Sequence, residues 1–183
     1  MIHSRLRGSR SLRLVFVTLC TALGVGLGFT SVAAADPPTR EPIELPTEPF
    51  IFTDTLGNNP CSFPVLVEIT TNREIVSTFT RQSGVTSIHT TGALKVRLTN
   101  TVTGKTIDRN ISGPILATVN SDGSLTQIGV GPALWVFDPG VAPELPRLVI
   151  TSGRTESILG PGSAFSLVSV RGSYEDICAT LAP

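Results

Sequence analysis

The sequence predicts an all-β domain, either a single antiparallel β-barrel or a β-sandwich, arranged mostly as a meander of about ten short strands. Val, Ile and Thr dominate many short runs, in which apolar and polar residues alternate with the period of two that a half-buried strand requires. The turn-forming residues Gly, Pro, Asn and Asp separate these runs at short intervals. Beyond the N-terminal region no stretch has an extended helical period, and together these patterns favour an all-β fold.

The first 35 residues have the pattern of a secretory signal peptide. Four arginines between positions 5 and 13 precede a mostly apolar segment, 14–29, and small residues fill positions 31–35. This order predicts cleavage after Ala35 and a secreted, extracellular protein with no stable membrane insertion after cleavage. The alternative is a transmembrane anchor, which the three glycines in the apolar segment and the small residues after it disfavour.

Cleavage would leave 148 residues, the size of one domain. Because the removed segment holds four of the 14 basic residues and none of the 14 acidic ones, the remaining chain would carry a net charge of −4. No run of basic residues remains after cleavage, so we expect no nucleic-acid partner.

Residues 36–60 are predicted to form a Pro-rich, extended N-terminal arm. Five prolines and alternating charges occupy 36–49, where a helix cannot form and little can be buried. A peptide ligand or a spacer that crosses a cell wall is the functional alternative for this arm. Its last apolar residues, 50–52, are suited to dock on the domain or to pair as a first edge strand.

The clearest strand pair of the predicted β domain, 61–183, lies at 94–112. Two alternating runs flank a turn at 100–104, where Asn100 and Gly104 tolerate a left-handed backbone, and this pattern predicts an antiparallel hairpin. The same reasoning predicts further strands at 65–70, 75–80, 85–90, 115–119, 125–130, 133–137, 147–151, 156–159 and 164–171, and a helical turn within 174–181.

Two cysteines remain after cleavage, because Cys20 lies in the signal segment. Cys61 and Cys178 are an even pair in an exported chain, which predicts one disulfide. A reactive or metal-binding thiol pair is the alternative, but neither cysteine has a nearby His or second Cys to complete a metal site. We expect no metal and no cofactor.

His89 is the one histidine between the signal segment and the C-terminus, and it is the candidate for catalysis. Ser87 and Thr90 are close in sequence, and an acid such as Asp108 would have to approach across strands to complete a Ser-His-Asp arrangement. The sequence has no Gly-x-Ser-x-Gly motif. We therefore assign no catalytic residue and keep an exported hydrolase using His89 as an alternative.

Trp135 and Phe137 are the candidate ligand-binding residues. They lie in the run 133–137, which is apolar at every position, so both faces of the strand must be covered or one must meet a partner. Core packing explains such a run. A lining for an enclosed apolar cavity is the alternative, since small barrels can hold one ligand.

Four short motifs point to a known group of proteins. They are Asn-Pro-Cys-Ser-Phe-Pro at 59–64, Leu-Thr-Asn-x-x-Thr-Gly-Lys at 98–105, Thr-Ser-Gly-Arg at 151–154 and Asp-Ile-Cys-Ala at 176–179. With the export signal, they make the chain similar to small secreted β-rich proteins of actinobacteria, a group with no assigned activity. The resemblance implies secretion, an all-β domain and a Cys61–Cys178 bridge, and it carries over no functional residues.

These patterns favour a secreted, non-catalytic binding or structural protein, whose partner is an extracellular ligand or a cell-envelope component of unidentified chemistry. A β-barrel that binds a small apolar molecule and the hydrolase using His89 are the alternatives. An enclosed cavity lined by Trp135 would favour the first alternative. Hydrogen bonds from His89 to a hydroxyl and an acid would favour the second.

Overall fold

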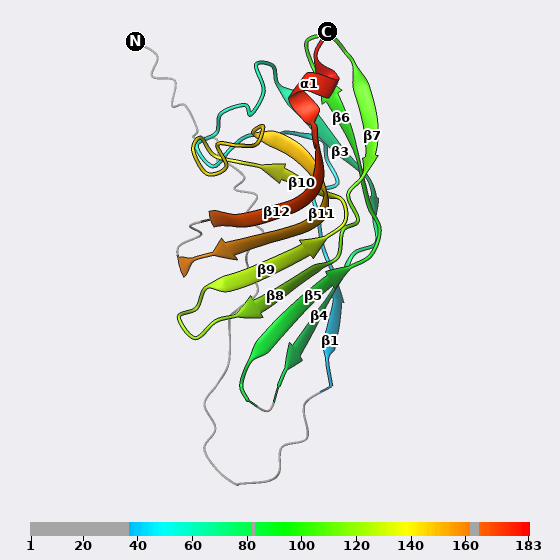
Figure 1. The fold of residues 1–183 in the computed structure, drawn as a ribbon. Coiled ribbons are helices and arrows are strands. Elements are labelled where there is room, and N and C mark those ends of the chain that lie inside the picture. The colour runs from blue at the N-terminus through cyan, green and yellow to red at the C-terminus, as the bar shows by residue number, and fades with distance from the viewer. Residues whose placement is uncertain (1–36, 82, 162–164) are drawn as a thin grey trace, which may run out of the picture.

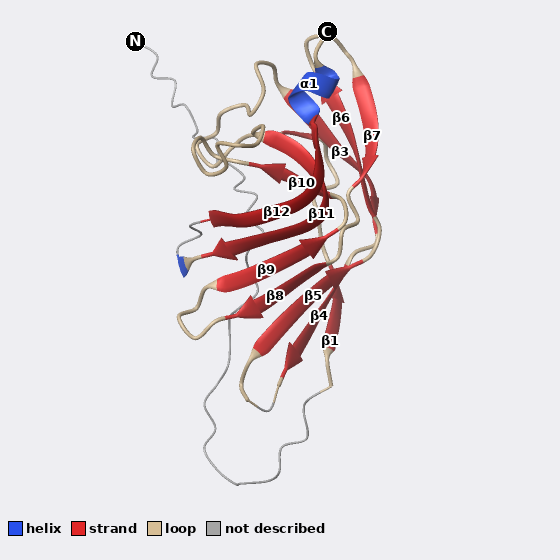
Figure 2. Ribbon diagram, in the orientation of Figure 1, coloured by secondary structure: helices blue, strands red, loops and turns tan. Residues whose placement is uncertain are grey.

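The computed structural model describes residues 37–81, 83–161 and 165–183. Within these residues the chain forms twelve strands and one short helix, α1 (Ile177–Leu181), as Figure 1 and Figure 2 show. All strand pairs are antiparallel, so the predicted all-β antiparallel class is confirmed. The predicted signal peptide and its cleavage site lie outside the described residues.

The strands divide between two sheets. The larger sheet contains β1 (Thr39–Pro42), β4 (Ile75–Thr80), β5 (Thr86–Thr91), β8 (Ile115–Val119), β9 (Leu125–Val130), β10 (Ala133–Val136), β11 (Leu148–Leu159) and β12 (Phe165–Asp176). Its order is β1-β4-β5-β8-β9-β11; β10 shares one edge of β11 with β9, and β12 pairs along the other edge. The smaller sheet runs in the order β2 (Phe50–Ile51), β3 (Val65–Asn72), β6 (Leu94–Asn100) and β7 (Thr106–Asn110).

The local hairpins agree with the sequence prediction, whereas the connections between sheets do not. Strands β6 and β7 form the predicted hairpin, as do β4 with β5 and β8 with β9. The chain changes sheet after β1, after β3, after β5 and after β7, so β3 pairs with β6 and β5 pairs with β8. The predicted sequential meander is wrong for these connections, because such long-range pairing is not decided by local turns. Neither sheet closes on itself within the part of the chain that the structure describes.

Strands β11 and β12 form one long hairpin. Except for Arg147, the runs 147–151 and 156–159 belong to a single strand of 12 residues, and β12 continues to Asp176 instead of ending at 171. Gly153, which separates the two predicted runs, lies opposite Gly172, and both have a positive φ, +132° and +130°. A Cβ on either glycine would collide with a carbonyl oxygen of the facing strand. The glycine pair therefore allows a close backbone approach where the hairpin curves towards α1 (Figure 1).

The hydrophobic core lies between the smaller sheet, the start of β11 and α1. Val65, Val67 and Leu98 of β3 and β6 are at most 1% exposed, and they form one cluster with the fully buried Leu148 and Ile177. Alternate positions of each strand point into this core, as the period of two predicts.

Part of the predicted arm is paired with both sheets. Strand β1 pairs with β4, and β2 pairs with β3, so the expectation that 50–52 pairs as an edge strand is confirmed. Phe50 and Phe52 also pack against the core. Charged residues and Pro42 in β1 suit an edge, because they discourage further strand pairing.

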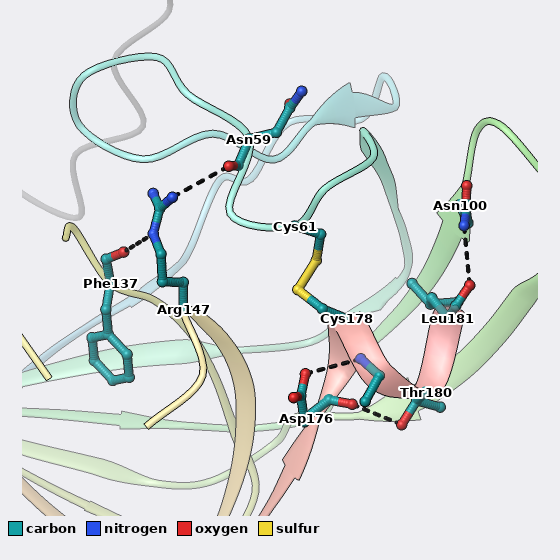
Figure 3. Close-up of a disulfide and its surroundings, with 10 residues drawn as sticks. Asn59, Cys61, Asn100, Phe137, Arg147, Asp176, Cys178, Thr180 and Leu181 are labelled. Carbon is teal, nitrogen blue, oxygen red and sulfur yellow. Dashed lines mark hydrogen bonds between the residues drawn. A yellow bond between two sulfur atoms is a disulfide. The ribbon is translucent and has the colours of Figure 1, made fainter. Parts of the chain in front are cut away.

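A disulfide joins Cys61 to Cys178, as predicted, with a Cα–Cα distance of 5.4 Å across a sequence separation of 117 (Figure 3). Asp176 caps the start of α1 by accepting a hydrogen bond from the Ala179 amide. At the other end of α1, the side-chain amide of Asn100 donates to the carbonyl oxygen of Leu181 at 3.0 Å. These contacts hold the C-terminal helix against the beginning of the β domain.

We expect Gly153→Ala to lower the free energy of unfolding by about 3 kcal/mol, since the added methyl group must displace the facing backbone. Chemical denaturation measures the change. Gly104→Ala is the matched control: Gly104 has a φ of +76°, but no atom lies within 4 Å of an added Cβ. The control should lose only about 1 kcal/mol from backbone strain. Equal losses in the two variants would contradict the close approach as the cause.

Candidate functional site

Three large apolar side chains of β8, β9 and β11 are exposed on the same face of the larger sheet. Leu116 is 37% exposed, Val130 51% and Ile158 38%. Leu116 lies directly opposite Ile128, which is two residues before Val130, and the register of β9 with β11 places Ile158 on the same face. We call Leu116, Ile128 and Val130 the β8–β9 patch. Its apolar surface is in contact with solvent.

The patch is open because the smaller sheet covers only one end of this face. Along β11 alternate residues share the face: Leu148 and Ile150 are at most 5% exposed in the core, whereas Arg154 and Ile158 are exposed. Strands β8, β9 and the end of β11 extend away from β3 and β6 (Figure 1). The same face therefore serves as core at one end and as free surface at the other.

A shallow depression of about 270 Å³ lies over the patch. The three patch residues line it together with Pro114, and its ionisable lining residues are His89 and Arg154. None of the residues that line the depression is a carboxylate. The surface therefore combines an apolar floor with cationic or hydrogen-bonding groups at its margin.

His89 lies at this margin and packs against an aromatic ring. Its imidazole centroid is 4.7 Å from that of Phe79, and in the register it lies opposite Ser77 and Leu116. Within the described ranges, no hydrogen bond joins His89 to a Ser or Thr hydroxyl or to a carboxylate. Asp108 lies in the smaller sheet, where it accepts from Arg97 at 3.0 Å. The structure therefore does not bring together the residues that a Ser-His-Asp arrangement would need.

Trp135 and Phe137 lie on the opposite face of the larger sheet. Their rings stack with centroids 6.3 Å apart, and Phe165 of β12 lies 5.9 Å from Trp135 and 6.3 Å from Phe137. The indole Nε1 donates to Thr151 Oγ1 at 3.0 Å. Phe137 is 2% exposed, so a ligand would reach its ring only after this cluster opened.

The residues of β10 that alternate with Trp135 and Phe137 point into the core. Leu134 and Val136 pack against the buried cluster between the sheets. The two-sided apolar run at 133–137 is therefore explained by packing on both faces, and the aromatic cluster occupies the second face. Strands β8 and β9 also carry large apolar residues at both alternating positions, and this signal in the sequence could have located the patch.

The outer face of the smaller sheet carries paired charges. Arg97 lies 3.0 Å from Asp108 and 3.6 Å from Glu68 on this face. Arg109 lies opposite the buried Val96, on the core side of β7, and makes two hydrogen bonds to Glu175 of β12. The Arg109 guanidinium lowers the pKa of the Glu175 carboxyl below its ordinary value. Because opposite charges are matched here, this face behaves as a solvated surface with little net field.

A partly buried ion pair fixes the loop before β3 to the loop before β11. The Asp54 carboxylate is fully buried, pairs with Arg147 at 2.5 Å and accepts hydrogen bonds from the Leu56 and Asn58 amides. Arg147 also donates to the carbonyl oxygens of Phe137 and Asn59 (Figure 3). Burial opposes ionisation of Asp54, but the hydrogen bonds and Arg147 outweigh it and lower the pKa of this carboxyl.

We expect Asp54→Asn to lower the free energy of unfolding at pH 7 by about 2 kcal/mol, because it removes charge-assisted hydrogen bonds and leaves the partly exposed Arg147 without its counter-charge. The pKa of Asp54 is lowered in the folded protein, so its stabilisation is complete above about pH 4 and is lost as the pH falls through the lowered pKa. The difference in the free energy of unfolding between the wild type and Asp54→Asn should therefore be smaller at pH 3 than at pH 7, and denaturation at both pH values measures it. Asp108→Asn, in an exposed pair, is the control and should change stability little.

Glu74 is a second buried carboxyl, 6% exposed, and burial raises its pKa. Its ionised form is thus disfavoured in the folded protein, and we expect Glu74→Gln to increase the free energy of unfolding at pH 7. The gain should vanish below about pH 4, where the wild-type carboxyl is protonated in both states. Urea denaturation at both pH values tests this, with the exposed Glu41→Gln as control. An increase in the free energy of unfolding that persists below about pH 4 would contradict the raised pKa of Glu74 as its cause.

Among the residues that the structure describes, no three His, Cys, Asp or Glu side chains are grouped so that they could hold a metal ion. In the same residues, no helix has the length and apolar character needed to cross a membrane. Comparisons with protein-family models, with curated proteins and with solved structures find no match to this chain.

Proposed function

We propose that this chain is a secreted, non-catalytic binding protein, and that the β8–β9 patch receives the apolar part of an extracellular ligand or cell-envelope component. The observation that carries the proposal is the exposure of Leu116 and Val130 of this patch, with Ile158 exposed on the same face of the larger sheet. Contiguous exposed apolar side chains are expensive for a soluble protein and mark binding surfaces more often than isolated ones do.

Two features support secretion. The N-terminal pattern of basic, apolar and small residues is the one that signal peptidases process. The Cys61–Cys178 bridge fits an oxidising compartment, since disulfides form and persist there. We also infer that the two sheets make an open sandwich, because the core lies between them and strands β8 and β9 continue past it.

The other two functions have less support. A small apolar ligand beside Trp135 would have to displace the stacked rings of Phe137 and Phe165. A hydrolase using His89 would need an activating carboxylate, and this side chain instead packs on Phe79 at the rim of the patch.

The test uses the neutral, environment-sensitive dye Nile red. We expect the secreted protein to enhance its emission, and the double variant Leu116→Ser/Val130→Ser to bind it about tenfold more weakly, because apolar contact area is lost. Leu56→Ser/Val102→Ser is the matched control, since both side chains are 74% exposed outside the patch. Thermal unfolding of each variant verifies folding. Equal binding by the two double variants would contradict the assignment of the patch.

A further inference from the structure

Two arginines face each other at the border of the patch. Arg154 of β11 lies directly opposite Arg171 of β12, so the two side chains leave the sheet on the same face. Both residues are exposed. Like charges at directly opposite positions destabilise a strand pair, so the fold itself gains nothing from this arrangement.

The arginine pair continues the apolar surface. On its other side Arg154 lies opposite Val130, so β9, β11 and β12 present Val130, Arg154 and Arg171 in one row. In the next row Ile128 lies opposite Glu156. The depression over the patch includes Arg154 in its lining, and thus the apolar floor and the first guanidinium belong to one site.

The net charge of this border is positive. Glu156 approaches Arg154 at 3.6 Å, with both side chains partly exposed, and neutralises one of the two guanidinium charges. In the described part of the chain Arg171 makes no ion pair. A group that binds between the two arginines would therefore be anionic, and guanidinium groups are well suited to hold a carboxylate.

We infer that the site binds a single-chain carboxylic acid, with its hydrocarbon chain on Leu116, Ile128 and Val130 and its carboxylate at Arg154 and Arg171. The inference rests on the proposed function and adds the class of ligand. The depression has a volume of about 270 Å³ and is shallow, so one hydrocarbon chain can lie along its floor with one side towards solvent.

The test compares three probes with the same chain, dodecanoate, dodecanol and dodecyltrimethylammonium, each below its micelle concentration and titrated against the secreted protein by Nile red displacement. We expect the protein to bind dodecanoate about tenfold more tightly than dodecanol, and the cation more weakly than either. Arg154→Gln/Arg171→Gln should abolish this preference, so that the variant binds dodecanoate no more tightly than dodecanol. The variant should also be at least as stable as the wild type, because the repulsion between the arginines is removed.

Arg73→Gln/Arg81→Gln is the matched control, because it removes the same charge at two exposed positions in turns outside the patch. It should keep the preference for dodecanoate. Equal loss in both double variants would show a general effect of net charge and overturn the site. Equal binding of dodecanoate and dodecanol by the wild type would overturn the ligand class but leave the proposed function standing, whereas no binding of Nile red would overturn both. Binding to phosphatidylglycerol vesicles without binding of dodecanoate would replace the free acid by a membrane surface.

Discussion

The close approach of β11 and β12 at Gly153 and Gly172 is the constraint on which the rest of the structure depends. One hairpin supplies both the buried layer and the open surface, because its closed end pairs with β9 and its other end enters the core and continues into α1. Only residues without a Cβ fit where the two backbones meet. At Gly153, β10 replaces β9 as the neighbour of β11. The Gly131 amide, between β9 and β10, donates to the Gly153 carbonyl oxygen there.

Two further contacts close the end of the fold at which the core lies. The disulfide ties α1 to the segment before β3, and the Asp54–Arg147 pair ties that segment to the loop before β11. A small second sheet of four strands, one with only two residues, buries a limited apolar area. Covalent and partly buried ionic links therefore contribute where hydrophobic burial alone is modest. Beyond the core, the larger sheet is held by the β4–β5 and β8–β9 hairpins and by the pairing of β5 with β8 and of β9 with β11.

Features that depend on residues close together in the sequence could be predicted, whereas features that depend on distant residues could not. Alternation and turn residues are local, so the hairpins at β6–β7 and β8–β9 and the cysteine pair were predictable. The pairing of β3 with β6 and of β5 with β8 joins strands that do not follow one another, and no local signal specifies it. The sequence predicts two strands on either side of Gly153, because a glycine within a strand pattern does not reveal whether another glycine faces it.

The candidate site was hidden for the same reason. Trp135 and Phe137 stood out as large aromatic side chains, whereas the patch becomes visible only when the register shows which apolar residues the second sheet leaves uncovered. The arginines are 17 positions apart in sequence and adjacent only across the hairpin. Protection of an edge strand by charge would explain Arg171, since β12 is paired on one side within the described residues. It does not explain Arg154, which lies on an interior strand between Val130 and Arg171. This surface combines an uncovered apolar floor with an exposed cation on an interior strand. A ligand with an apolar part and an anionic group explains it better than a contribution to folding stability does.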